Sequence, residues 1–595
     1  MIKVLKRSIR EYKTASILTP LFVALEVVME CLIPLFMSYI LGKAQEETPD
    51  TTLIIILSLV ILVLGFFSLT FGVLSGKFGA IAAAGFAKNL RRDLFFKSQD
   101  FSFENIDRFS SASLVTRMTT DVSNIQMAYG MIIRITVRVP LMMIFSITLT
   151  FIMSIKIGII YLCIVPILGL ILFIIIKCAM PLFDKVFHKY DALNASIEEN
   201  IKGIRVVKTY VREDYEKSKF QKSAEDVRHD FVKAERIVAW NQPVMVFFMY
   251  LSLTVVSFFS AYLIITTNKT ELGIQNISAI ITYGTQILMS LMMLSMIFVM
   301  ISLSISSMHR VVEVLNEEST IQNPVNPIYE VKDGSVEFKN VSFKYSKDAE
   351  KFALADVNLA IQSGQTIGIL GGTGSSKTTF VNLLSRLYDT TEGEVLVGGR
   401  NVKDYDLKTL RDQVAVVLQK NVLFSGTILE NLRWGNEHAT VDEVKEACKL
   451  SCADEFVEQF PEKYDTYIEQ GGTNVSGGQK QRLCIARALL KKPKILILDD
   501  STSAVDTKTD AMIRKAFKEN IPNTTKIIIA QRVSSIEEAD QIIVLDGGRI
   551  HGIGTHEELI QSNAIYQEVY SLQNKKEEDD NEEEKNSIKN ISSHS

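Results

Sequence analysis

The sequence predicts two fold classes on one chain, an all-α membrane domain followed by an α/β domain. Its 595 residues are 47% hydrophobic, and a mean hydropathy of +0.18 is high for a soluble chain of this length. The apolar residues gather into six long runs within the first half. In the second half, a glycine-rich loop lies between an apolar strand and a helical pattern, a unit typical of α/β domains.

Each apolar run is long enough to cross about 30 Å of hydrocarbon as a helix. The first is too long, and too polar in its middle, to be a cleaved signal peptide. Basic residues gather at the N-terminus and in the links 78–130 and 183–242, so we expect both termini and these links to be cytoplasmic. The predicted spans are 16–42, 52–78, 131–155, 157–182, 243–267 and 275–307.

The two long cytoplasmic links have helical periodicity rather than the composition of flexible loops. We expect the membrane helices to continue for about 25 residues, or about 35 Å, into the cytoplasm. Each link is broken once, at 105–111 and at 209–215. These breaks predict short helices or turns at the far end of each extension.

Four ionisable residues fall inside predicted membrane helices, where charge is costly and often functional. Glu26 and Glu30 lie one turn apart in the first span, and Arg134 and Arg138 share that spacing in the third. One interpretation is that they form structural ion pairs between helices. The other is that the two glutamates line a translocation path and favour cationic amphiphiles. A methionine stripe on the sixth span is compatible with either packing or an adaptable binding surface.

The loop after the apolar strand 367–370 has the P-loop pattern, in which backbone N–H groups face phosphates. Lys377 would neutralise phosphate charge and Thr378 would bind Mg²⁺. Ser376 stands where this pattern has glycine, which adds a Cβ to the phosphate cradle. The predicted nucleotide-binding residues here are Gly371, Gly372, Thr373, Gly374, Ser375, Ser376, Lys377, Thr378 and Thr379.

Four further elements follow or flank this loop in a fixed order. Tyr345 lies upstream, where an aromatic ring could stack on adenine or belong to the core. Gln419 ends an apolar strand, and its amide could reach a metal or water. Residues 475–479 open a helix and form a second anion-binding terminus, which predicts closure on another subunit's nucleotide. A further apolar strand ends at Asp499, as in a Walker-B magnesium site.

With these motifs, the chain resembles a half-transporter of the ABC exporter family, and most closely the degenerate-site subunit of bacterial heterodimeric multidrug exporters. The resemblance implies a six-helix transmembrane domain and a P-loop ATPase domain with an α-helical subdomain. Tyr345 matches the A-loop, Gln419 the Q-loop and Asp499 the Walker-B aspartate. The two cytoplasmic breaks resemble coupling helices. The signature motif, serving a partner's site, matches Ser476, Gly477, Gly478 and Gln479.

Two positions depart from the family pattern at the step of hydrolysis. Asp500 stands at the catalytic glutamate and Gln531 at the switch histidine. Aspartate is shorter by about 1.5 Å, and a misplacement of about 1 Å can slow a reaction on the order of a hundredfold. Glutamine donates a hydrogen bond but cannot shuttle protons. The sequence therefore predicts a site that binds ATP and Mg²⁺ and hydrolyses slowly, the alternative being that Asp500 is an acceptable base.

The resulting prediction is one half of a heterodimeric exporter of amphiphilic drugs in a bacterial cytoplasmic membrane, paired with a second half-transporter. Export of peptides or lipids, an ATP-gated sensor and a slow homodimeric ATPase are the alternatives. A net charge of −4 indicates no nucleic-acid partner, and six scattered cysteines give no disulfide framework. The predicted domains are 1–325 (membrane), 326–574 (ATPase) and 575–595, an acidic and disordered tail.

Overall fold

The computed structural model describes residues 1–267, 272–346, 349–501 and 504–573. The chain forms two compact units. The membrane unit comprises Met1–Asp100 and Ser110–Glu317, and the second unit comprises Phe101–Phe109 together with the chain from Glu318 onward. The division at Glu317 lies before the predicted boundary at residue 325, because the last membrane helix ends at Asn316. The predicted acidic tail lies outside the described residues.

Among the residues that the structure describes, the membrane unit contains six helical segments long and apolar enough to cross a membrane, as predicted. They exceed the predicted spans, since α3 alone has 49 residues, or about 74 Å at 1.5 Å per residue. The elements are α1 (Ile2–Lys6), η1 (Arg7–Tyr12), α2 (Lys13–Ala44), α3 (Thr51–Gln99), α5 (Ser111–Thr116), a π-helical turn η2 (Arg117–Asp121), α6 (Val122–Met153), α7 (Ile155–Lys202), α8 (Ile204–Thr209), α9 (Glu213–Val238), α10 (Asn241–Thr266) and α11 (Asn276–Asn316).

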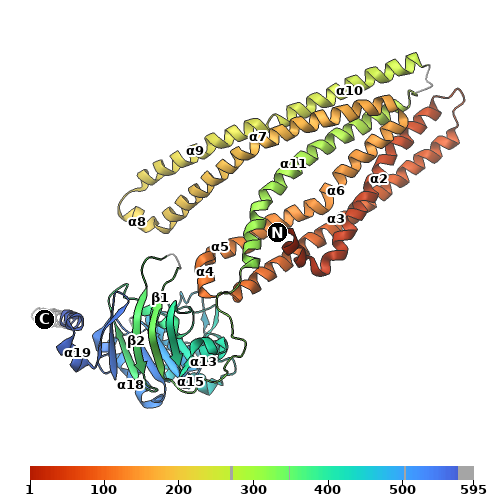
Figure 1. Cartoon of the computed structure of the whole chain (residues 1–595). Coiled ribbons are helices and arrows are strands. Elements are labelled where there is room, and N and C mark those ends of the chain that lie inside the picture. The colour runs from red at the N-terminus through yellow and green to blue at the C-terminus, as the bar shows by residue number, and fades with distance from the viewer. Residues whose placement is uncertain (268–271, 347–348, 502–503, 574–595) are drawn as a thin grey trace, which may run out of the picture. The chain divides into compact units, whose positions relative to one another are not determined.

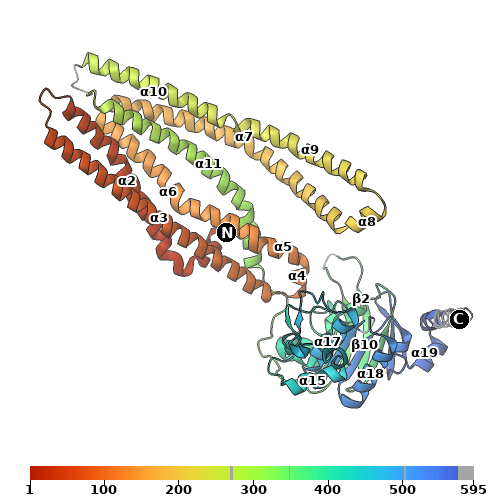
Figure 2. The ribbon, with the colours of Figure 1, turned by 180° about the vertical axis from the view of Figure 1, so that it is seen from behind.

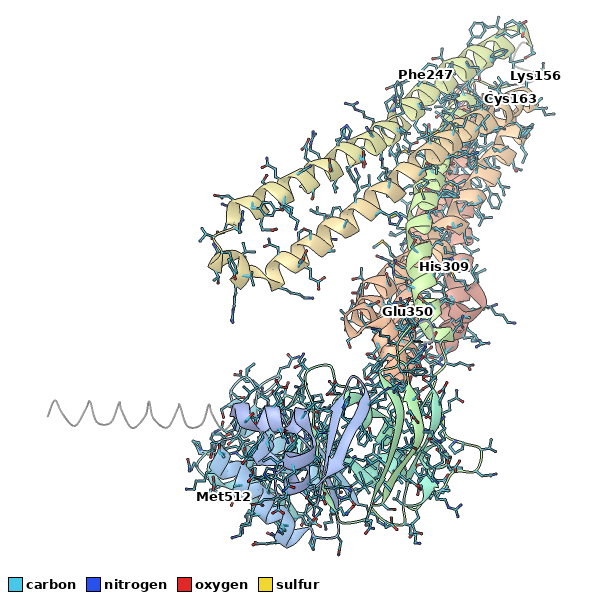
Figure 3. All side chains as sticks on the ribbon, turned by 60° about the vertical axis from the view of Figure 1, so that its left-hand side comes forward. Lys156, Cys163, Phe247, His309, Glu350 and Met512 are labelled. Atoms are coloured by element: carbon cyan, nitrogen blue, oxygen red, sulfur yellow. The ribbon has the colours of Figure 1, made fainter. Side chains whose placement is uncertain are left out.

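Within this unit the helices form two groups that separate toward one end (Figures 1 and 2). Helices α2, α3, α6 and α11 stay together, whereas α7 and the α9–α10 pair diverge from them and meet at α8. Tyr210 and Val211, just beyond α8, are 73% and 79% exposed. At the opposite end of the helices, Lys156 lies in the first turn of α7, far from His309 on α11 (Figure 3). The second predicted break, 209–215, therefore lies at the turn between the end of α8 and the start of α9, at the tip of a long hairpin.

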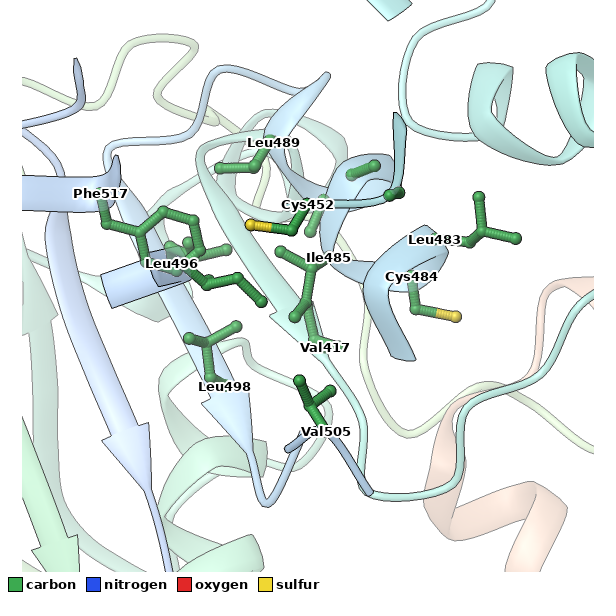
Figure 4. Close-up of a cluster of buried hydrophobic side chains, with 14 of the residues drawn as sticks. Val417, Cys452, Leu483, Cys484, Ile485, Leu489, Leu496, Leu498, Val505 and Phe517 are labelled. Carbon is green, nitrogen blue, oxygen red and sulfur yellow. The ribbon is translucent and has the colours of Figure 1, made fainter. Parts of the chain in front are cut away.

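The second unit is built on a six-stranded sheet of order β12-β11-β3-β10-β9-β6 and a four-stranded antiparallel sheet of order β2-β1-β4-β5. Strands β11, β3, β10, β9 and β6 are parallel. Strands β3, β9 and β10 are buried almost throughout, as expected for central parallel strands. Figure 4 shows Ile485 of α17 against Val417 of β6, within the core that joins the helices to this sheet.

The strands and helices of this unit follow in chain order. They are α4 (Phe103–Phe109), β1 (Val336–Phe343), β2 (Leu354–Ile361), β3 (Thr366–Leu370), α12 (Lys377–Leu384), β4 (Glu392–Val397), β5 (Arg400–Asn401), η3 (Val402–Asp404), α13 (Leu407–Gln413), β6 (Val414–Val417), β7 (Gly426–Thr427), α14 (Ile428–Arg433), α15 (Val441–Leu450), α16 (Asp454–Val457), η4 (Lys463–Asp465), β8 (Tyr467–Ile468), α17 (Gly477–Leu489), β9 (Ile495–Asp499), α18 (Thr507–Asn520), β10 (Thr525–Ile529), η5 (Val533–Ser535), β11 (Gln541–Asp546), β12 (Arg549–Gly554) and α19 (His556–Ser562).

Candidate nucleotide site and membrane ion cluster

The glycine-rich loop leaves the end of β3 and enters α12 at Lys377. Gly371 is required by a close approach, because a Cβ there would lie 2.4 Å from the Leu545 carbonyl oxygen. Gly374 has φ +85° and Ser376 has φ +74°, both in the left-handed region. For a residue with a side chain this conformation costs about 1 kcal/mol. Ser376 therefore keeps the loop geometry that glycine would adopt, at a cost in strain.

Lys377 is folded back onto the loop that precedes it. Its Nζ donates to the carbonyl oxygens of Gly371 at 2.7 Å and Gly372 at 2.8 Å. Burial lowers the pKa of this ammonium, and the charges of Asp499 and Asp500 oppose that shift. A cation held by neutral carbonyl groups in a half-buried loop is well placed to exchange them for phosphate oxygens.

Thr378 and Asp499 come together although they are far apart in the sequence. The Thr378 hydroxyl donates to Asp499 Oδ2 at 3.2 Å. Asp499 is 4% exposed at the end of β9, and burial raises the pKa of its carboxyl group. These groups fit Mg²⁺, which usually takes one or two carboxylates together with waters and nucleotide phosphates. Among the described residues, no group of three or more His, Cys, Asp or Glu side chains is arranged so that it could hold a metal ion.

The two positions that depart from the family pattern contact each other. Gln531 Nε2 donates to Asp500 Oδ2 at 2.8 Å, and Gln419 Nε2 lies 3.5 Å from the same oxygen. Asp500 itself has φ +49°, immediately after β9. The short carboxylate is thus engaged by the amide at the switch position. Sequence reasoning placed both residues at the hydrolytic step but gave no sign of this hydrogen bond.

Tyr345 lies just beyond β1, beside the start of α12. Its hydroxyl is 2.9 Å from Thr379 Oγ1, and the residue is 45% exposed. The ring is held edge-to-face between Phe343 and Tyr388, at centroid distances of 4.8 and 5.2 Å. A partly exposed, immobilised ring next to the phosphate loop is suited to stack on a base. Tyr388 was missed by sequence reasoning, because it belongs to no motif that distinguishes it from a core tyrosine.

The signature residues form the N-terminus of α17. The Ser476 hydroxyl accepts from the Gln479 backbone N–H, and the Gln479 side chain accepts from the Ser476 backbone N–H, so the two make a reciprocal capping box. Gly478 is packed so closely that a Cβ would lie 2.8 Å from the Ala504 carbonyl oxygen. The terminus is therefore capped and closely packed, and the N-terminus of a helix is suited to bind an anion through its free backbone N–H groups.

In the membrane unit, one arginine bridges both glutamates. Arg138 on α6 pairs with Glu26 and, at 2.6 Å, with Glu30, both on α2. Glu26 also accepts from Ser75 at 3.4 Å. Within the described chain, Arg134 takes no part in this ion pairing and instead lines a groove of about 610 Å³ between α3 and α6. Two carboxylates facing one guanidinium leave the cluster one negative charge in excess.

Comparisons with known proteins agree with this geometry. Residues 16–291 match the ABC transporter transmembrane region and residues 354–503 match the ABC transporter family. Similar proteins include an uncharacterised ABC transporter ATP-binding protein YfiB of Bacillus subtilis, 36% identical over 84% of this chain and 86% of that protein. Another is a putative ABC transporter ATP-binding protein of Mycoplasma pneumoniae, the MG014 homolog, 31% identical over 96% and 98%.

Two further similarities concern proteins of described activity or structure. An ATP-dependent lipid A-core flippase of Hahella chejuensis is 32% identical over 90% of each chain. The structure of a bacterial Atm1-family ABC exporter with ATP bound superposes with a TM-score of 0.82, covering 95% of this chain and 99% of that one. At 23% identity, this likeness establishes the exporter fold.

Proposed function

This chain belongs to the ABC transporter family as a half-transporter with an ATPase domain on the same polypeptide, and we propose that it forms one half of a heterodimeric exporter. Bound Mg²⁺-ATP, held through Lys377, Thr378, Gln419 and Asp499, supplies the phosphoryl transfer that drives export. The chain's own site is the weakly hydrolytic one of the pair. Its signature motif completes the competent site on the partner.

The contact between Gln531 and Asp500 is the observation that carries this proposal. A general base must lie within hydrogen-bond reach of the water it activates. The Asp500 carboxylate is one methylene short, and one of its oxygens is already engaged by the Gln531 amide. Glutamine also has no titratable group that can accept or release a proton near neutral pH. Both substitutions weaken the same step, whereas phosphate and metal binding through Lys377, Thr378 and Asp499 are left intact.

The signature supports an unlike partner. Its capping box and the close packing of Gly478 suit an anion-binding terminus, although the chain's own motifs are altered at the hydrolytic positions Asp500 and Gln531. An intact signature terminus contributes to transport only if the nucleotide that it contacts is hydrolysed efficiently. We therefore place the competent Walker motifs on a different chain, and the pair in a bacterial cytoplasmic membrane with both termini of this chain inside.

For the substrate, we propose small amphiphilic molecules, with the excess negative charge beside Glu30 favouring cations. Lipid export is the second candidate, and the similarity to a lipid A-core flippase over 90% of both chains favours it. Transport assays in proteoliposomes with a cationic dye and with a fluorescent phospholipid separate the two. Movement of the lipid alone would replace the drug proposal.

The heterodimer is tested by removing carboxylates from the assembled transporter one at a time. Asp500→Asn should leave most ATPase activity, whereas the same change at the partner's equivalent carboxylate should nearly abolish it. Ser476→Arg should also cripple turnover, because it places a cation and bulk in the terminus that closes the competent site. Loss of activity in Asp500→Asn, or full activity in Ser476→Arg, would overturn the assignment.

A further inference from the structure

Tyr388 lies between the candidate adenine platform and the short helix α4. It is 7% exposed, and its ring packs edge-to-face against Tyr345 at 5.2 Å and against Phe343 at 5.6 Å. All three aromatic residues belong to the same compact unit, as does α4 itself. A buried ring in contact with both neighbours restricts how the Tyr345 ring can turn.

The other side of Tyr388 is tied to α4. Its hydroxyl donates to the Asp107 carboxylate, and the Phe103 ring lies 6.3 Å from its own. Burial raises the pKa of the Tyr388 hydroxyl, and the Asp107 charge raises it further, so this hydroxyl remains a donor throughout the physiological range. A hydrogen bond from a buried hydroxyl to a carboxylate is among the stronger kinds.

Helix α4 is also held to the segment that opens the ATPase unit. The Asn105 side chain donates to the Glu318 carbonyl oxygen at 3.1 Å, and the Ser102 and Thr320 hydroxyls lie 2.7 Å apart. In the sequence, α4 stands between the membrane helix α3 and the helix α5. A shift of α4 would therefore displace Tyr388, because Asp107 and Phe103 of α4 contact it.

We propose that Tyr388 is a positioning residue that fixes the Tyr345 ring and, through its hydroxyl bond to Asp107, links occupancy of the adenine face to the position of α4. The inference rests on the proposed role of Tyr345 as the adenine platform. It goes beyond that role because it connects α4 to the bound base rather than to the phosphates. The triphosphate acts on Lys377 and Thr378, whereas the base acts on Tyr345 and, through Tyr388, on α4.

The test compares MgATP with magnesium tripolyphosphate, which has the phosphates but no base. In the full-length transporter in lipid nanodiscs, hydrogen–deuterium exchange of the peptide spanning 371–379 reports binding at this chain's own site. The midpoint of its protection gives an apparent affinity for each ligand. Because the readout needs no turnover and belongs to one chain, it is independent of which site hydrolyses ATP.

Tyr345→Ala should raise the MgATP midpoint by at least about fivefold, as expected for loss of base–aromatic stacking, and leave the tripolyphosphate midpoint unchanged. Tyr388→Ala should do the same, and the double variant should be no worse than either single one. An unchanged MgATP midpoint in Tyr345→Ala would show that Tyr345 is not the adenine platform, and it would also refute the proposal for Tyr388. A selective loss in Tyr345→Ala but not in Tyr388→Ala would refute the positioning role alone.

The link to α4 is read from exchange of residues 101–110. MgATP should protect this segment more than tripolyphosphate does, and Tyr388→Phe or Asp107→Ala should abolish the difference. Tyr405→Phe is the matched control, since it removes a buried tyrosine hydroxyl that donates to the Val397 carbonyl and not to α4. Glu104→Ala controls for loss of an acid on the same helix. Persistence of the difference in Tyr388→Phe would overturn the link, and this variant decides the matter if Tyr388→Ala does not fold.

Discussion

Removing both membrane glutamates should destabilise the transporter, because Arg138 would lose the two carboxylates with which it pairs among the described residues. The side chains of Glu26 and Arg138 are 12% and 28% exposed, so the charge cannot be fully solvated by rotation. Uncompensated buried charges typically cost about 3–5 kcal/mol. We expect the lower end of that range for Glu26→Gln combined with Glu30→Gln, since the Arg138 side chain is only partly buried.

Each single change should be much milder. Glu26→Gln leaves the Arg138–Glu30 pair, and Glu30→Gln leaves the Arg138–Glu26 pair, so each removes only the excess negative charge. Arg134→Met is the matched control, because it removes an arginine one turn away that lies outside this ion cluster. The assay is thermal unfolding of the purified protein in nanodiscs. The reasoning is refuted if the double variant melts at the wild-type temperature, or if Arg134→Met is as damaging.

The single variants also distinguish the two interpretations of the cluster. If the excess charge attracts cationic substrates, Glu30→Gln should slow export of a cationic dye more than that of a neutral analogue, at wild-type stability. Equal loss for both dyes, together with a lower melting temperature, would show that the cluster is structural.

Two further predictions concern the ATPase unit. Ser376→Gly should raise the free energy of unfolding by about 0.5–1 kcal/mol, because it relieves the strain of the left-handed backbone at φ +74°. Ser376→Ala retains that strain and should not raise it. Denaturant unfolding in which the alanine variant is more stable than the glycine variant would contradict this prediction. Burial raises the pKa of Cys448 to about 12, against about 8.5 in an unfolded chain. The folded state therefore keeps a proton that the unfolded state loses, and stability should decline above about pH 9, by roughly 1 kcal/mol per pH unit. Cys448→Ala should flatten that decline in unfolding measured from pH 8.5 to 10.5; an unchanged slope would show that Cys448 does not cause it.

The six membrane helices could be predicted because an apolar run of about 20 residues has few other stable outcomes. The turn from the glycine-rich loop into a helix at Lys377 could likewise be predicted from the P-loop motif. The spacing of Glu26 and Glu30 predicted that they share one face of α2. It did not predict the rotation of α6 that brings Arg138 rather than Arg134 to them. That rotation is set by packing between helices.

Contacts between distant segments were the least accessible to sequence reasoning. Asp107 and Tyr388 are 281 residues apart, and neither has a local pattern that points to the other. The hydrogen bond between Gln531 and Asp500 depends on the ends of β9 and β10 lying next to each other in the sheet. Each residue could be assigned to the hydrolytic step from its motif position, whereas their mutual engagement required the fold.

The unequal hydrolysis of the two sites is tested most directly by trapping. The assembled transporter is incubated with 8-azido-ATP, Mg²⁺ and orthovanadate, cross-linked by light, and the label on each chain is quantified after separation. Because trapping with vanadate requires turnover, this chain should carry at least about tenfold less label than its partner, a conservative figure for a base misplaced by about 1 Å. Equal labelling of two chains, or strong labelling of a transporter made of this chain alone, would contradict the account.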